Sequence, residues 1–155
     1  MSARRERGRE GRYPNMAETM KLEIVTPEGT AFSEDVEMVT LTGIQGEMGI
    51  LPGHARLMTK IVPGEMVVRK GGRDVFVAAG GGLVEVTGRR VSVLTDMAVA
   101  ADKIDEAKAE EARQRAEARL KEKLSAQEVA SVNASLVRSL AQLQVRRRRR
   151  VGSGM

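Results

Sequence analysis

The sequence contains no cysteine, a single histidine, His54, and few aromatic side chains. Without cysteine it can form no disulfide framework, thiolate nucleophile or cysteine-ligated metal site. One histidine also argues against a Ser-His-Asp triad or a histidine-based zinc site within the chain. No apolar run reaches the roughly 18 residues that a membrane-spanning helix needs. A small enzyme is therefore the least favoured class, and no cofactor is required.

The positive charge is concentrated at the two ends of the chain. Residues 1–15 carry five Arg and two Glu, residues 146–150 are five consecutive Arg, and the region between is net acidic although the chain has a net charge of +5. Charge-dense segments with few apolar side chains bury too little surface to offset the entropy cost of ordering. The sequence thus predicts a disordered basic extension over residues 1–20 and a disordered arginine-rich tail over residues 146–155.

These basic ends leave one alternative function open. A free-standing nucleic-acid-binding protein could hold phosphates with its termini, and such binding would weaken steeply with salt. The aromatic side chains on which bases stack are scarce, however, because the chain contains only Tyr13, Phe32 and Phe76. Composition therefore keeps this alternative open without favouring it.

Residues 21–97 have the pattern of an all-β domain. Short β-rich runs alternate with glycine and proline turn signals about every eight to twelve residues, which is typical of a sandwich or barrel. Polar and apolar side chains alternate over residues 21–25, as in a sheet with one solvated face. The sequence predicts a β-sandwich over residues 21–97. Strands are expected at residues 22–26, 36–42, 56–61, 66–69, 74–78, 83–86 and 91–94.

The pattern becomes helical after Met97, where glycine disappears until Gly152 and apolar side chains recur at helical spacing. One helix is expected from about residue 102 to 123. A second is expected after Ser125, where Ser125 and Glu128 fit a capping box. Two amphipathic helices with so short a connection form an antiparallel hairpin. The predicted fold class is α+β, an N-terminal β-sandwich followed by a C-terminal two-helix hairpin over residues 102–145.

The predicted hairpin contains little hydrophobic mass, because its first helix presents mainly alanine methyl groups. Burial of a leucine side chain contributes about 1.5 to 3 kcal/mol, and alanine far less. Weak packing on the β domain is therefore expected, and a rearrangement of the hairpin is energetically plausible. A permanently docked hairpin of ordinary stability is the alternative.

Residues 43–54 form the most constrained segment, with four glycines, one proline, Glu47 and His54. We expect a tight loop, because glycine reaches positive φ freely and Leu51-Pro52-Gly53 is a turn signature. The simpler interpretation is a turn with a solvated carboxylate and a turn histidine. The triplet at residues 80–82 lacks the Lys-Ser/Thr end of a P-loop, so it favours a bulge or a close approach of strands.

The ordered residues from Gly46 to His54, preceded by Val36-Glu37-Met38-Val39-Thr40 and followed by the glycine triplet and a helical tail, resemble the signature of the ε subunit of rotary ATP synthase, called δ in mitochondria. The resemblance runs from about residue 21 to 145. It implies a non-catalytic rotor component in the central stalk of a proton-translocating ATP synthase. The implied partners are the γ subunit, the c-ring and the catalytic α and β subunits, with no nucleic acid. The implied location is peripheral, on the cytoplasmic side of a bacterial plasma membrane and in contact with it only through the c-ring.

The same resemblance implies two sets of contact residues. Glu47 and His54 match the positions that contact the c-ring. The hairpin is expected to inhibit ATP hydrolysis in an extended state, with basic residues that meet an acidic segment of the catalytic β subunit. These are Arg113, Arg115, Arg119, Lys121, Lys123, Arg146, Arg147, Arg148, Arg149 and Arg150. A solvated charged face is the alternative for the helix, but five consecutive arginines are not expected to be neutralised locally, and they could steer the chain toward an acidic partner.

ATP is a further ligand that the resemblance implies. Some bacterial relatives bind it through Ile or Leu, Asp, two variable residues, Arg and Ala. The corresponding residues here are Ile104, Asp105, Lys108 and Ala109, with Arg115 and Arg138 as further phosphate contacts. Lysine lacks the planar fork that binds phosphate through two hydrogen bonds, so Lys108 weakens the expected binding. The alternative is that Asp105 only stabilises the first turn of a helix.

Overall fold

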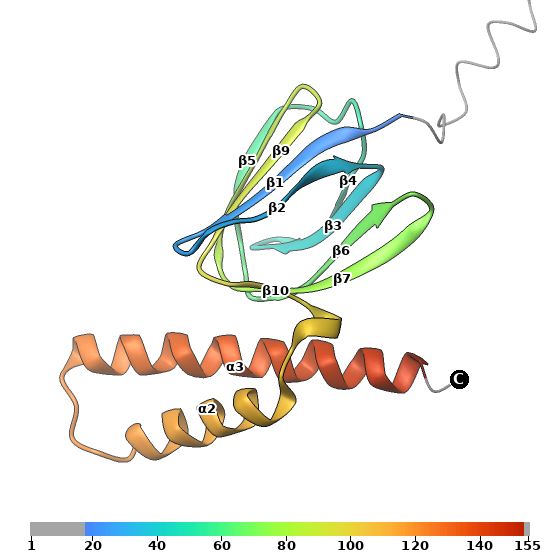
Figure 1. Ribbon diagram of the computed structural model, residues 1–155. Coiled ribbons are helices and arrows are strands. Elements are labelled where there is room, and N and C mark those ends of the chain that lie inside the picture. Colours follow the sequence, from blue (N-terminus) through green and yellow to red (C-terminus); the bar gives the residue numbers. More distant parts are fainter. Residues whose placement is uncertain (1–17, 154–155) are drawn as a thin grey trace, which may run out of the picture.

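The computed structural model describes residues 18–153, with side chains through residue 149. Ten strands are followed by a short 3-10 turn and two helices, which lie beneath the strands in Figure 1. The strands are β1 (Met20–Thr26), β2 (Gly29–Val36), β3 (Met38–Gly43), β4 (Gly46–Ile50), β5 (Leu57–Ile61), β6 (Gly64–Lys70), β7 (Arg73–Ala79), β8 (Gly82–Thr87), β9 (Arg90–Thr95) and β10 (Ala98–Ala100). The 3-10 turn is η1 (Ala101–Lys103), and the helices are α2 (Glu106–Arg119) and α3 (Ala126–Ser153).

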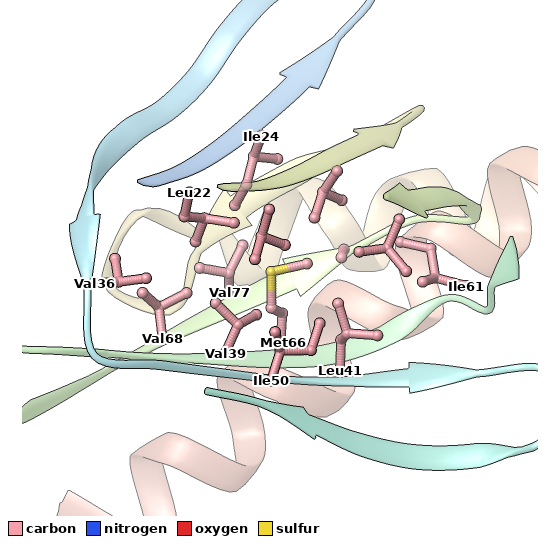
Figure 2. Packing of buried hydrophobic residues seen from close by; sticks show 14 of the residues in the cluster. Leu22, Ile24, Val36, Val39, Leu41, Ile50, Ile61, Met66, Val68 and Val77 are labelled. Carbon is pink, nitrogen blue, oxygen red and sulfur yellow. The ribbon is translucent and has the colours of Figure 1, made fainter. Parts of the chain in front are cut away.

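The strands form one sheet that folds over itself into the predicted sandwich. Its order is β10-β7-β6-β3-β5-β8-β9-β1-β2, with β4 paired to β3 outside this path. Strands β1 and β9 are parallel, whereas neighbours such as β8 and β9 are antiparallel. Figure 2 shows side chains of both layers meeting in the interior, with Leu22 and Ile24 of β1 near Val39 and Met66. The fold class predicted from the sequence is confirmed.

Three strands were not predicted, and all three lie at margins of the sheet. Strands β2 and β10 end the strand path, and β4 pairs with β3 outside it. Most of β2 is exposed, because it is an edge strand with one paired side and few apolar residues. Hydrophobic alternation is therefore weak at these positions, and tertiary pairing decides their structure.

Strand β4 also corrects the expectation that residues 43–54 form a loop throughout. Gly43 pairs with Gly46, so only Ile44 and Gln45 turn the chain before β4 runs back along β3. Gly46 has a φ of +121°, which explains why glycine is suited to the start of this strand. The fully buried side chain of Ile50 anchors its end. Only the segment after β4 remains a loop.

The helix boundaries differ from the expected ones. Residues 101–103 form η1, so α2 begins only at Glu106 and ends at Arg119. Helix α3 starts as predicted, because Ser125 Oγ accepts a hydrogen bond of 3.1 Å from the Glu128 amide. It continues to Ser153, so residues 146–153 of the tail expected to be disordered are helical, and residues 154 and 155 lie outside the described residues. Arginine is a good helix former, and the run finds carboxylate partners on neighbouring elements. Of the N-terminal extension expected over residues 1–20, residues 1–17 lie outside the described residues.

The hairpin is docked on the sandwich through a second, smaller apolar cluster. Helix α3 lies against β6, β7 and η1, whereas α2 packs against α3 (Figure 1). The buried members of the cluster are Ala78, Met97, Ala101, Ile104, Ala141 and Val145, with Phe76 and Val99 packed beside them. Three of the six buried residues are alanines, which bury little apolar area. The hairpin is therefore docked in a compact state through little buried apolar surface. This agrees with the small hydrophobic content of the hairpin sequence.

The glycine triplet provides a test of the fold. A Cβ on Gly82 would lie 1.8 Å from the carbonyl oxygen of Leu94, whereas the nearest atom to a Cβ on Gly81 is 3.7 Å away. Strands β8 and β9 would have to move apart, so we expect Gly82→Ala to lower the free energy of unfolding by about 2 to 3 kcal/mol. Urea unfolding measures this loss. Gly81→Ala is the matched control, and an equal loss in both variants would contradict the close approach.

Candidate functional site

The two polar residues expected at a c-ring contact lie on neighbouring but different segments. Glu47 is exposed on β4, opposite Thr42 of β3. It lines a polar cavity of about 220 Å³ between the sandwich and α3, together with Glu65 and Arg148. His54 lies in the loop after β4, where its Nδ1 donates a hydrogen bond of 2.7 Å to the carbonyl of Ala55. This contact orients the ring, and the His54 amide donates a hydrogen bond of 3.1 Å to the Leu51 carbonyl, which closes the turn.

A surface patch that the sequence analysis missed covers the outer face of β5, β8 and β9. Met58 is 64% exposed, Leu83 41% and Leu94 53%. Leu83 lies opposite both Lys60 and Leu94, and Met58 is two residues from Lys60 on the same face. The signal was present, because Leu83 and Leu94 occupy outward positions where alternation calls for polar side chains. Grouped exposed apolar side chains of this kind mark interaction surfaces.

The basic residues of α2 are only partly free to meet a partner. Arg113 Nη1 lies 2.7 Å from Glu117 Oε1, and Arg113 Nε donates a hydrogen bond of 3.0 Å to Glu110. The bond from Arg113 lowers the pKa of Glu110 and raises that of Arg113. Arg119 is near Glu122 and Glu128 at 3.8 and 3.7 Å. Arg115, Lys121 and Lys123 are exposed, and the Arg119 side chain is also 52% exposed despite these two long contacts.

Arg147, Arg148 and Arg149 pair with carboxylates of the same chain, so the arginine run is partly neutralised locally, which corrects the expectation from its sequence. Helix α3 carries the run across the rim of the sandwich, where carboxylates of β6 and α2 lie within reach. Arg147 Nε is 3.1 Å from Glu106 Oε1, and Arg149 Nε donates a hydrogen bond of 2.9 Å to Glu65. The further contacts are Arg146 Nη1 to the Ala101 carbonyl at 3.3 Å, Arg147 Nη2 to Glu110 at 3.2 Å and Arg148 Nη1 to Glu65 at 3.4 Å. The side chain of Arg150 lies outside the described residues.

The residues expected to bind ATP have structural contacts of their own. Asp105 Oδ1 accepts a hydrogen bond of 3.1 Å from the Lys108 amide and so caps α2. Ile104 and Ala109 are buried. Arg138 Nη1 lies 3.3 Å from Asp96 Oδ2.

Of the residues expected to bind ATP, Arg115 lines a groove between α2 and α3. This groove has a volume of about 370 Å³ and is also lined by Arg119, Ser131 and Ser135. The carboxylate of Glu128 also lines this groove, 3.7 Å from Arg119, so Arg115 is the guanidinium group there that is better placed for an anion. The structure thus gives Asp105 and Arg138 roles within the fold, and it leaves ATP binding a prediction.

Comparison with known proteins decides the family. Residues 19–101 match the family described as ATP synthase, Delta/Epsilon chain, beta-sandwich domain, and residues 102–146 match its long alpha-helix domain. The chain belongs to the ATP synthase delta/epsilon chain family. It is therefore a non-catalytic subunit, and the expectations of family and of no enzymatic activity are confirmed.

Members of this family with similar sequences are found in diverse bacteria. The ATP synthase epsilon chain of Desulforamulus reducens is 48% identical over 108 residues, covering 70% of this chain and 82% of the relative. That of Herpetosiphon aurantiacus is 41% identical over 131 residues, covering 84% and 96%. A chain in the cryo-EM structure of the Euglena gracilis mitochondrial ATP synthase, OSCP/F1/c-ring, has 25% identity and a TM-score of 0.62, with 79% of this chain and 78% of that chain covered.

These comparisons do not favour the nucleic-acid-binding alternative. It depended on both basic ends, and at the C-terminal one Arg147, Arg148 and Arg149 pair with carboxylates of the same chain. Within residues 18–153, neither helix is long and apolar enough to cross a bilayer.

The role of Asp105 can be tested directly. We expect Asp105→Ala to destabilise α2 by about 1 kcal/mol, because the first turn loses its capping oxygen. Faster amide exchange in residues 106–109 would report this loss. Asp105→Asn is the matched control, since its side chain retains a capping oxygen and should leave exchange nearly unchanged. Equal acceleration in both variants would assign the effect to the negative charge rather than to the cap.

Proposed function

We propose that this chain is the epsilon subunit of an ATP synthase central stalk, where its sandwich couples the γ subunit to the c-ring and its hairpin inhibits ATP hydrolysis. The observation that carries the proposal is the exposed apolar patch on a sandwich whose core is otherwise closed. In this assignment the chain is peripheral, on the cytoplasmic side of a bacterial plasma membrane. It contributes no active site to ATP synthesis. Its roles are to transmit torque and to regulate ATP hydrolysis.

The patch on β5, β8 and β9 is the proposed surface for γ. Its apolar centre at Met58, Leu83 and Leu94 is flanked by Lys60 and Glu85, which lie opposite Leu83 and Met58. An apolar centre with polar neighbours is the composition of a stable protein interface. Rigid strands hold these side chains, so binding orders few of them.

The turn between β3 and β4 is the proposed c-ring contact. Ile44 at the turn is 60% exposed and Leu51 after β4 is 51% exposed, and Glu47 lies between them in sequence. An apolar tip with one nearby carboxylate can contact a short polar loop while its backbone stays fixed by the pairing of β3 and β4. His54 acts in this proposal by bracing the loop that follows.

The hairpin is the proposed inhibitory element. Helix α2 packs on α3, and the described contacts of the hairpin with the sandwich are made mainly by α3. Release therefore requires opening of the small cluster around Ala141 and Val145 and of the ion pairs of α3. A released hairpin would present Arg115, Lys121 and Lys123 together with the arginine run to the catalytic α and β subunits. Complementary charge speeds such an encounter.

ATP remains a possible regulatory ligand of the compact hairpin. The groove beside Arg115 and Arg119 supplies cationic side chains, whereas Arg138 is already paired with Asp96. Calorimetric titration of the full chain with ATP measures the affinity. We expect Lys108→Arg to tighten binding, because arginine restores the planar fork. No heat with either chain would remove ATP from the proposal.

The proposed inhibition is tested with a catalytic head that contains γ and lacks its epsilon subunit. Its ATP hydrolysis rate is measured during titration with the full chain or with a truncation that ends at Ala100, which keeps β10. We expect both to bind and only the full chain to inhibit. Binding of both without inhibition would leave a coupling role alone, and failure of both to bind would overturn the proposal.

The apolar patch has its own test. We expect Leu94→Asp to weaken binding to the same complex at least tenfold, roughly the cost of losing a central apolar contact and burying a charge. Leu94→Met is the matched control, because it keeps an apolar side chain at this exposed position. Surface plasmon resonance measures both affinities. Wild-type binding by Leu94→Asp would place the γ contact elsewhere.

A further inference from the structure

We propose that Glu65, Phe76, Arg148 and Arg149 form a latch that holds α3 on the sandwich, so that the arginine run stabilises the compact hairpin. Arg149 reaches Glu65 Oε2 through Nε at 2.9 Å and Oε1 through Nη2 at 2.5 Å. Arg148 Nη1 adds a third bond, to Oε1, at 3.4 Å. These are bonds from the end of α3 to one carboxylate of β6.

The Glu65 carboxylate lies in a position where its charge requires these partners. Its side chain is only 13% exposed, and that of Arg149 is 31% exposed, so both are shielded from water more than an ordinary surface pair. Exposed pairs contribute little because water and salt screen them. A carboxylate this shielded is costly to leave without a partner. The docked helix removes water from Glu65, and Arg148 and Arg149 compensate the cost of that desolvation in the docked state.

Phe76 supplies the other side of the latch. The Arg149 guanidinium carbon lies 3.6 Å from the centre of the Phe76 ring, within the range of a cation–π contact. Phe76 also packs against the docking cluster that contains Val145, one helical turn before Arg149. The latch therefore continues the apolar seam of Ala141 and Val145 with a side chain that is part hydrophobic surface and part charge.

The neighbouring arginines connect the latch to the rest of the hairpin. Arg146 donates to the Ala101 carbonyl of η1, and Arg147 pairs with Glu106 and Glu110 of α2. Consecutive side chains of α3 thus contact η1, α2 and β6. All these contacts are made together in the compact arrangement. The latch consequently sets the balance between a docked and a released hairpin, and its regulatory consequence rests on the proposed inhibitory function.

A latch and a purely inhibitory role predict opposite changes in inhibition when the contacts of the arginines are lost. Arginines that only engaged the catalytic subunits would weaken inhibition when neutralised. Arginines that also hold the compact state compete with release, so loss of their sandwich partner strengthens inhibition. Changing Glu65 instead of the arginines separates the two roles, because Glu65 belongs to the sandwich and every arginine stays intact.

The latch is tested in the full chain carrying Ala141→Cys, whose thiol is the only one because the sequence has no cysteine. Ala141 is 6% exposed in the docked state, so the rate of maleimide labelling reports opening of the seam. We expect Glu65→Gln to speed labelling about tenfold, the size associated with loss of a charge-assisted hydrogen-bonded pair. Arg149→Lys should give a smaller increase, since lysine keeps the charge and loses the fork.

Glu34→Gln is the matched control. It removes one carboxylate and breaks the pair between Glu34 and Lys70, which lies within the sandwich. We expect it to leave the labelling rate unchanged. Wild-type labelling by Glu65→Gln, or equal acceleration by Glu34→Gln, would overturn the latch. A double variant, Glu65→Gln with Arg149→Gln, should be less than additive, because both changes remove the same interaction.

Inhibition of the catalytic head by the same variants separates the latch from the proposed function. Faster labelling of Glu65→Gln with stronger inhibition supports both. Faster labelling without inhibition by any chain supports the latch and overturns the inhibitory function. Inhibition by the unchanged chain with wild-type labelling of Glu65→Gln keeps the function and overturns the latch.

Discussion

Branched aliphatic side chains fill a closed core between the two layers of the sandwich, and their packing holds the strands in register. Leu22, Ile24, Val36, Val39 and Val68 are essentially inaccessible and come from both layers of the sandwich (Figure 2). Aliphatic side chains are compact, so the two layers pack closely around this core. Because this core is complete within residues 20–93, the sandwich offers its outer surfaces to partners and to the hairpin.

The hairpin is attached to that sandwich by a different balance of forces. Its seam contains several alanines, and charged side chains continue the contact where the apolar surface ends. Apolar contacts of this size provide modest stabilisation, while shielded ion pairs depend strongly on geometry. In the proposed function, the sandwich remains rigid as the coupling element while the hairpin exchanges between partners. One chain combines both properties because its two apolar clusters are separate and unequal in size.

The sequence predicted the elements that bury many side chains and failed where pairing alone decides. In strands such as β1 and β9, buried and exposed side chains alternate clearly because one face lies in the core. The start of α3 was predicted from Ser125, which caps the helix. Strands β2, β4 and β10 lie at margins and bury little, so no local signal distinguished them from loops. The latch was equally invisible, because Glu65 and Arg149 are 84 residues apart and become partners only through folding. Local composition predicted a disordered run, whereas tertiary structure supplies counter-charges for Arg147, Arg148 and Arg149.

The arginine run shows why composition alone misjudged the end of the chain. Positive side chains in the last turns of a helix interact favourably with its dipole, so α3 is a better place for these charges than an extended tail. Each described arginine from Arg146 to Arg149 then finds an oxygen acceptor on another element. Position 149 particularly suits arginine, because one planar group reaches both oxygens of Glu65 while its face lies over Phe76. Helix propensity, dipole and counter-charge favour the same conformation, and together they order a segment whose charge density alone predicts disorder.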